Sequence, residues 1–207
     1  MNNAITRTLA ISSFALLMSA CAGTQKVPVE AKFGLSSAKD NYKNFSIFQG
    51  SSSSNDPGFS LEAEIDPGVK DRIVYSGGYQ QLSDIEFDGL YMGVDDVGKI
   101  ETEMLTVSAG YRYPFTDRFS AGGRIGAAAV DVNEQELFGG VPEKSSASET
   151  VPYGGITMKY RVNDRFAISA NYDRYLDVGE EGETGEGDID VFGLSFDISF
   201  GASRGSD

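Results

Sequence analysis

The sequence predicts an all-β fold, an eight-stranded antiparallel up-and-down transmembrane β-barrel with short periplasmic turns and long extracellular loops. Three observations predict it: apolar and polar side chains alternate along most of the chain, short and long links follow one another strictly, and the N-terminus has the form of an export signal. The length of 207 residues suits a single domain. We therefore expect a signal peptide over 1–20, a short periplasmic tether over 21–28, the barrel over 29–200 and a C-terminal tail over 201–207.

The export signal is an apolar run of about a dozen residues, Leu9 to Ala20, behind a short head that carries one basic residue. A helix needs about 20 apolar residues to span a bilayer, so this run is too short to be a transmembrane helix. Two processing sites fit its end. Leu17 to Cys21 resembles a lipobox, which predicts lipid attachment at Cys21, whereas Ala20-Cys21-Ala22 fits ordinary cleavage after Ala22. Cys21 is the only cysteine, so one chain cannot form an internal disulfide.

Period-2 alternation is the signal for the strands. It is clearest in the last one, where Phe192, Leu194, Phe196, Ile198 and Phe200 share one face, opposite Val191, Gly193, Ser195, Asp197 and Ser199. Similar ladders occupy 29–37, 58–65, 72–81, 100–113, 118–130, 152–162 and 166–175. Most have the 9–11 residues that a tilted strand needs to cross the hydrocarbon.

The links between these segments alternate in length. Short ones, rich in Pro, Gly, Asn and Asp, lie at 66–71, 114–117 and 163–165. Long ones lie at 38–57, 82–99, 131–150 and 176–188. An up-and-down barrel with short turns at one end and long loops at the other produces this parity.

An Asp-Arg pair followed by an apolar residue opens three of the predicted strands, and its arginines, Arg72, Arg118 and Arg165, recur after 46 and 47 residues. The segments 111–119 and 153–166, together with the aromatic-ended strand that closes at Phe200, resemble the small outer-membrane barrels of the OmpA-like type. The resemblance implies a bacterial outer-membrane location, with the barrel-insertion machinery as a partner during biogenesis. The sequence departs from such barrels in having no Trp.

The two faces of the predicted strands differ in charge. One is apolar and would face lipid. The other carries ten charged residues, which we predict to form an interior ion-pair network: Glu30, Lys32, Glu62, Glu64, Arg112, Arg124, Lys159, Arg161, Asp173 and Asp197. An eight-stranded barrel is only wide enough for its side chains to fill it, and unpaired buried charges are costly. We therefore expect a plugged barrel, with Arg112, Arg124, Lys159 and Arg161 paired to Glu62, Glu64, Asp173 and Asp197.

Composition limits the function classes. The chain contains no His, so no Ser-His-Asp triad can form and we predict no enzyme activity. A net charge of −14 argues against nucleic acid as a partner. We expect no cofactor beyond loosely bound Ca²⁺ or Mg²⁺, for which the long loops offer weak carboxylate candidates: Asp84, Glu86, Asp88, Asp95, Asp96, Glu180, Glu181, Glu183 and Glu186.

Three interpretations follow from the sequence. The first is a non-enzymatic outer-membrane barrel with a structural or envelope-integrity role, monomeric and in contact with outer-membrane lipids and lipopolysaccharide. The second is a surface binding or adhesion module that acts through its acidic loops. The third is a soluble periplasmic β-barrel lipoprotein that binds a small ligand.

Overall fold

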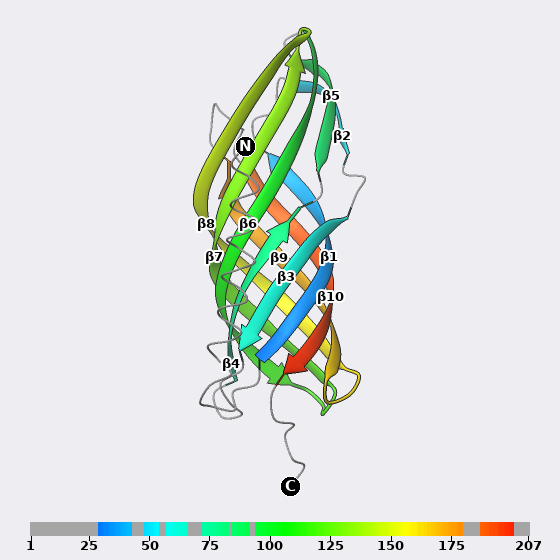
Figure 1. The fold of residues 1–207 in the computed structure, drawn as a ribbon, viewed down its shortest axis with the longest axis vertical. Coiled ribbons are helices and arrows are strands. Elements are labelled where there is room, and N and C mark those ends of the chain that lie inside the picture. Colours follow the sequence, from blue (N-terminus) through cyan, green and yellow to red (C-terminus); the bar gives the residue numbers. More distant parts are fainter. Residues whose placement is uncertain are drawn as a thin grey trace.

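A computed structural model of the chain describes residues 29–42, 48–53, 57–65, 72–82, 84–91, 94–179 and 187–200 (Figure 1). The predicted signal peptide, tether, Cys21 and C-terminal tail lie outside these residues. Within the described part, no helix is both long and apolar enough to cross a membrane.

The described residues form one antiparallel sheet of ten strands. These are β1 (Val29–Tyr42), β2 (Phe48–Ser53), β3 (Gly58–Ile65), β4 (Ile73–Gln81), β5 (Ile85–Tyr91), β6 (Val94–Pro114), β7 (Phe119–Phe138), β8 (Val141–Arg161), β9 (Phe166–Val178) and β10 (Gly187–Phe200). Eight of them close into a barrel, because β1 pairs with β10 and β6 pairs with β7 in addition to the order β6-β4-β3-β1-β10-β9-β8-β7. Each barrel strand therefore neighbours the strands before and after it, which confirms the predicted eight-stranded up-and-down fold.

Two of the short turns have the same hydrogen bonds. In one, the amides of Phe115 and Thr116 donate to the carbonyl of Phe119, at 2.9 and 3.1 Å. In the other, Val162 and Asn163 donate to Phe166 at the same two distances. Both turns lie at the lower end of the barrel in Figure 1, which we call the turn end. The β6–β7 and β8–β9 turns thus lie at the same end of the barrel, as the parity of the links predicts.

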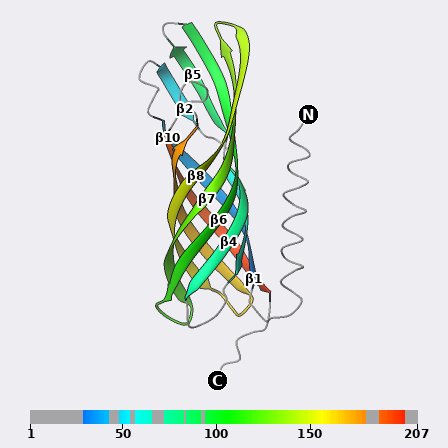
Figure 2. The ribbon, with the colours of Figure 1, turned by 90° about the vertical axis from the view of Figure 1, so that its left-hand side faces the viewer.

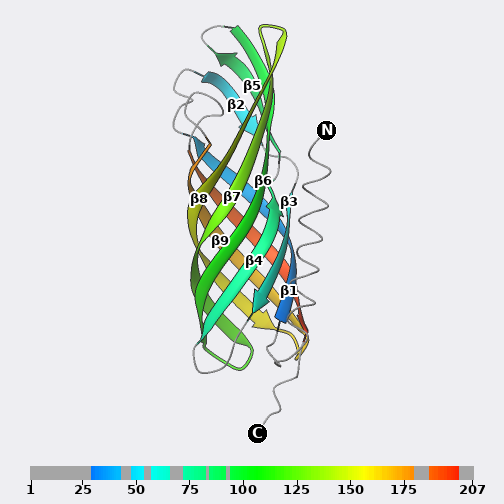
Figure 3. The same ribbon diagram turned by 60° about the vertical axis from the view of Figure 1, so that its left-hand side comes forward.

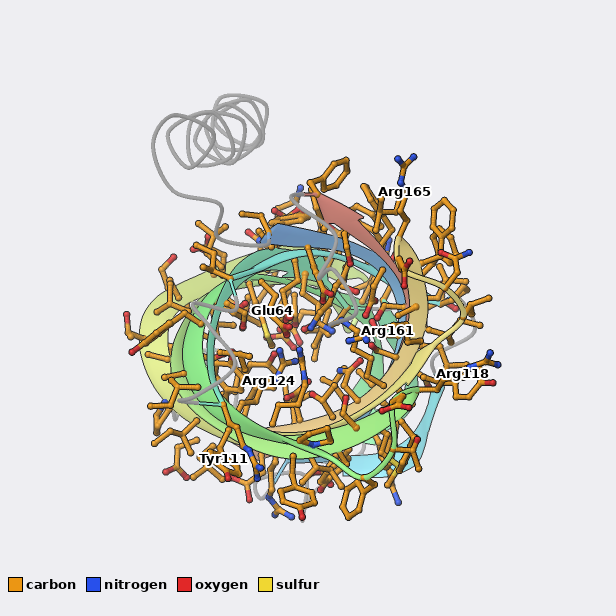
Figure 4. The ribbon with its side chains drawn as sticks, turned by 90° about the horizontal axis from the view of Figure 1, so that it is seen from below. Glu64, Tyr111, Arg118, Arg124, Arg161 and Arg165 are labelled. Atoms are coloured by element: carbon orange, nitrogen blue, oxygen red, sulfur yellow. The ribbon has the colours of Figure 1, made fainter. Side chains whose placement is uncertain are left out.

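The apolar face of the strands lies on the outside of the barrel. On β10, Phe192, Leu194 and Phe196 are 56%, 65% and 46% exposed, whereas Asp197 on the opposite face is fully buried. Figure 4, a view along the barrel from the turn end, shows Glu64 and Arg124 inside the ring of strands and Tyr111 outside it. This arrangement is inverted relative to a water-soluble protein, and it is the one that a bilayer requires.

Two of the predicted long links, 82–99 and 131–150, consist largely of strand in their described residues, contrary to our expectation of loops. Residues 131–138 continue β7 and residues 141–152 continue β8, so that 131–150 forms a hairpin with its turn at Gly139 and Gly140. The segment 82–99 forms most of the β5–β6 hairpin, and β2 pairs with β5. We call β2, β5 and the parts of β6, β7 and β8 over 94–102, 131–138 and 141–150 the extension. It stands above the closed barrel in Figures 2 and 3.

Candidate functional site: the filled barrel interior

The half of the interior nearer the turn end contains a network of ion pairs that joins strands from all around the barrel. Lys32 on β1 lies between two carboxylates of β3, with its Nζ 2.8 Å from Glu62 and 2.6 Å from Glu64. Arg112 on β6 contacts Glu64 from the other side, at 2.5 and 2.6 Å. The alternation that directs even-numbered residues of β1, β3 and β6 inward is what brings these four side chains together.

Arg124 on β7 connects this group to the far wall. Its Nε and Nη2 donate to the two oxygens of Asp173 on β9, at 2.8 and 2.7 Å, and its Nη1 donates to Glu62 at 2.5 Å. Asp173 is 1% exposed and also accepts a hydrogen bond from Asn171 at 2.7 Å. The bidentate geometry is the strongest form of such a pair and fixes both side chains.

A second group lies between β8, β1 and β10. Lys159 pairs with Glu30, and its Nζ is 3.6 Å from Asp197. Asp197 is fully buried and accepts hydrogen bonds from Ser169 at 2.5 Å and Ser195 at 2.9 Å. The two serine hydroxyls therefore supply hydrogen bonds to the Asp197 carboxylate, to which the Lys159 ammonium is not close enough to donate one.

Nine of the ten predicted network residues take part, and Arg161 is the exception. It is the last residue of β8, it is exposed, and it donates a 3.5 Å hydrogen bond to the main-chain oxygen of Asp117. Figure 4 shows it at the open turn end of the lumen. Alternation sets the direction of a side chain but not its depth, so Arg161 points inward at a level where water can solvate it.

Glycines make room for the largest of these pairs. A Cβ on Gly155 would overlap the Asp173 carboxylate, and a Cβ on Gly122 would overlap the main chain at Tyr111. Both glycines face the lumen from β8 and β7. At Gly155 the missing side chain leaves the space that the Arg124–Asp173 pair occupies, and at Gly122 it permits the close approach of the neighbouring main chain.

The half of the interior nearer the extension is apolar, which the sequence analysis missed. Its twelve buried members are Leu82, Ile100, Met104, Ala128, Val130, Val132, Val151, Tyr153, Tyr175, Val178, Ile189 and Val191. The rings of Tyr153 and Tyr175 stack 4.9 Å apart, and the Tyr175 hydroxyl lies 3.0 Å from the Gln80 side chain. One signal in the sequence could have revealed this layer. Along β7 the apolar residues move from the odd-numbered, outward positions, such as Ile125, to the even-numbered, inward positions Val130 and Val132.

Little space remains between the two layers. A cavity of about 30 Å³ lies among Lys32, Ser36, Glu62, Arg124 and Tyr175. A space of this size holds a water molecule or two and no larger solute.

The chain matches the model of the outer membrane protein β-barrel domain over residues 8–200. It belongs to that family. No curated protein matches the chain significantly. This outer-membrane barrel resembles Ail, the attachment invasion locus protein of Yersinia pestis, with a TM-score of 0.57 and 14% identity over 85% of this chain and 100% of that one. It also resembles AlkL, an outer membrane protein determined in DMPC lipid bilayers, with a TM-score of 0.54 and 15% identity over 89% and 95%.

Family and fold together place this outer-membrane barrel in the bacterial outer membrane, which excludes the soluble periplasmic interpretation. The short turns of such barrels face the periplasm, so the extension lies on the extracellular side. The apolar outer surface, between the aromatic residues near the short turns and the polar outer residues of the extension, is the surface that meets lipid.

The predicted cation sites of the outer-membrane barrel lie in and beside the extension. Asp84 pairs with Lys99 at 2.7 Å, and Lys99 also pairs with Glu101 at 3.0 Å. Glu86 is exposed. The side chains of Asp88, Asp95, Asp96, Glu180, Glu181, Glu183 and Glu186 lie outside the described residues. Among the side chains that the structure does describe, no three metal-ligating groups gather into a site.

Proposed function

We propose that this protein is a non-enzymatic, non-conducting barrel that contributes to the structure of the outer membrane. The observation that carries the proposal is the filling of the lumen by two successive layers, ion pairs below and apolar side chains above. Each layer alone would obstruct a solute, for different physical reasons. A permeating ion would have to break buried pairs in the first layer and enter a hydrocarbon-like medium in the second.

The ion-pair layer also connects strands that do not pair through their backbones. Arg124 on β7 reaches Glu62 on β3, and Lys32 on β1 and Arg112 on β6 meet at Glu64. These contacts tie opposite walls of the cylinder together, whereas the backbone ladders tie only neighbours. A barrel built in this way resists deformation, which suits a structural component and not a pore that must open.

Planar-bilayer recordings test the proposal. Purified, heat-modifiable protein should give no stable current steps under conditions in which a 16-stranded porin, with its aqueous channel, conducts. Large and stable single-channel currents from the native chain would contradict it. Gel mobility of the unheated sample shows that the barrel was folded during the recording.

A second function, binding at the cell surface, is supported by the extension. Its strands pair over their full described lengths, so it presents a continuous sheet outside the membrane rather than separate loops. Its described charges are mostly acidic, since seven acidic residues outnumber Lys99 and Lys144: Glu86, Glu101, Asp131, Glu134, Glu136, Glu143 and Glu149. Ail of Yersinia pestis has been solved with a polyanion, the heparin analogue sucrose octasulfate. The acidic extension of this chain disfavours such a ligand and favours a cationic partner.

Shortening the β7–β8 hairpin separates the two functions. Val132 and Ala147 face each other, so replacing residues 133–146 with Asn-Gly leaves a two-residue hairpin in the native register. If the extension is a binding surface, this variant keeps its heat-modifiable barrel and loses attachment to a cationic target such as polylysine-coated beads. Unchanged attachment would refute the binding function and leave the structural one intact.

A further inference from the structure

Three arginines occupy equivalent places on the periplasmic rim. Arg72, Arg118 and Arg165 each precede the first residue of a strand that rises from the turn end, namely β4, β7 and β9. The main-chain oxygen of each accepts a hydrogen bond from the neighbouring strand, at 2.8, 2.7 and 2.8 Å respectively. The three therefore lie at one level, each separated from the next by a single strand.

Their side chains face the lipid side of the barrel wall. Figure 4 shows Arg118 and Arg165 projecting away from the ring of strands, in contrast to Arg124 and Arg161. The guanidinium of Arg72 lies 4.7 Å from the ring centre of Tyr113, which is itself an outward-facing side chain. The arginines are thus on the outer surface, next to the apolar band.

The turns do not need these arginines or the aspartates before them. In one turn the Thr116 hydroxyl accepts hydrogen bonds from the amides of residues 118 and 119, at 3.3 and 2.9 Å. In the other, the Asn163 side chain accepts from residues 165 and 166, at 2.9 and 3.0 Å. Within the described part of the chain, neither the side chains of Asp117 and Asp164 nor those of the arginines after them form an ion pair or a side-chain hydrogen bond. The side chains of these two Asp-Arg pairs thus play no part in closing their turns and are exposed at the surface of the barrel.

The position of the pairs indicates what those partners are. Directly after the arginines come exposed apolar residues, Phe119 and Phe166, and Phe115 beside them is 60% exposed. Aromatic side chains of this kind mark the boundary between acyl chains and headgroups. The arginines lie one residue further toward water, at the level expected for the lipid phosphates, and an exposed aspartate precedes Arg118 and Arg165 in the sequence.

We propose that the Asp-Arg pairs at 117–118 and 164–165 are binding sites for phospholipid headgroups of the periplasmic leaflet that carry both a phosphate and a primary ammonium. The arginine pairs with the phosphate and can do so through two parallel hydrogen bonds. The aspartate accepts hydrogen bonds from the ammonium. A quaternary ammonium cannot donate such bonds, so the sites prefer phosphatidylethanolamine to phosphatidylcholine.

Arg72 extends the same rim with a different geometry. Its backbone has a φ of 51°, a left-handed conformation that is strained for a residue other than glycine, and its Nη1 lies 3.3 Å from the Tyr111 hydroxyl. Tyr111 and Tyr113 hold the guanidinium against the outer wall at the level of the other two arginines. Its position gives a third phosphate contact on the same side of the barrel.

Native mass spectrometry of the full chain, released from nanodiscs of equimolar phosphatidylethanolamine and phosphatidylcholine, tests the proposal. The native barrel should retain phosphatidylethanolamine about fivefold over phosphatidylcholine, the factor that one net hydrogen bond to the ammonium provides. The pair R118Q/R165Q should reduce retention of both lipids about fivefold. The pair D117N/D164N should abolish the preference for phosphatidylethanolamine while retaining phosphatidylcholine as the native chain does.

The matched control is R174Q, which removes an exposed arginine at the extracellular end of β9. It should retain lipids as the native chain does. Equal retention by R118Q/R165Q and the native barrel would overturn the proposal, as would equal losses in R174Q or an unchanged preference in D117N/D164N. Heat-modifiability of each variant excludes misfolding as the cause. The proposed lipid sites lie only on the periplasmic rim, so their failure would not affect the proposal of a plugged interior. Conversely, a conducting pore would contradict the plugged interior but not the lipid sites.

Discussion

Arg124 is the residue whose removal should disturb the interior most, and the size of the effect follows from its partners. Arg124→Met deletes three charge-assisted hydrogen bonds, two to Asp173 and one to Glu62. Glu62 keeps Lys32 at 2.8 Å, whereas Asp173, 1% exposed, keeps only the Asn171 amide among the described contacts. Removing one partner of a buried ion pair costs about 3–5 kcal/mol, because it leaves an uncompensated charge in a medium of low polarity.

A double-mutant cycle isolates this charge effect from the lost packing. Asp173→Asn alone should cost about 3–5 kcal/mol of unfolding free energy. In the double variant both charges are gone, so its cost should fall short of the sum of the single costs by about 2–3 kcal/mol. The chain has no Trp, so guanidinium unfolding in lipid vesicles is followed by far-UV circular dichroism and by gel mobility of unheated samples.

The matched control is Arg174→Met on β9, the strand that carries Asp173. Arg174 pairs with Asp188 at 2.7 Å, but its side chain is 45% exposed, and pairs of this kind contribute at most about 1 kcal/mol. A coupling energy near zero between Arg124 and Asp173 would refute the interior network. So would a cost for Arg174→Met as large as that for Arg124→Met.

Three further substitutions, the first with its own control, test separate parts of the structure by the same unfolding measurement. Gly155→Ala places a methyl group against the buried Asp173 carboxylate on β9 and should lower the free energy of unfolding by about 1–3 kcal/mol. Its control is Gly123→Ala, which should be close to neutral because the nearest neighbour of the new Cβ would be 3.6 Å away. Tyr175→Phe leaves the Gln80 side chain without its 3.0 Å hydrogen-bond partner in the apolar layer and should cost about 1–3 kcal/mol. Leu194→Arg, at a position 65% exposed on the lipid face, should cost about 2–4 kcal/mol in vesicles.

Two exposed positions provide controls for the last two substitutions. Tyr160→Phe, on the outer surface, and Ser146→Arg, on the extension, should each stay within about 0.5 kcal/mol of the native chain. A harmless Leu194→Arg would mean that this face does not contact hydrocarbon. A harmless Tyr175→Phe would mean that Gln80 finds another partner.

The part of the fold that the sequence predicts well is the part inside the membrane. There one rule holds from end to end, apolar residues outside and polar ones inside, so the eight strands and their faces follow from alternation alone. Above the membrane the rule reverses. On β7 the apolar residues change from the outward Ile125 to the inward Val130 and Val132. In the sequence this reversal, across Ala127 to Ala129, resembles the end of a strand. The backbone continues as a strand through this change, which is why the extension was mistaken for loops.

The interior network could be predicted as a set of residues but not as a set of pairs. Alternation places nine charged side chains inside, whereas their partners depend on how the closed barrel sets strands that are distant in sequence at matching heights. Lys159 and Glu30, which pair across 129 residues, illustrate this dependence. Arg161 shows the same limit, since it has the right direction but the wrong height. The apolar layer was missed because several of its members, such as Ile100, Val132 and Ile189, alternate with polar residues, so that the apolar face of the strand is the inner one there.

The most direct test is to place single tryptophans on the two sides of the wall, since the native chain has none. Tyr175→Trp puts the probe among the buried residues of the interior, and Leu194→Trp puts it on the outer surface. In vesicles of brominated phospholipid, fluorescence from position 194 should be strongly quenched and fluorescence from position 175 should not, with aqueous acrylamide reaching neither. Strong quenching by lipid at 175, or by acrylamide at 194, would contradict a filled barrel whose apolar face meets the acyl chains.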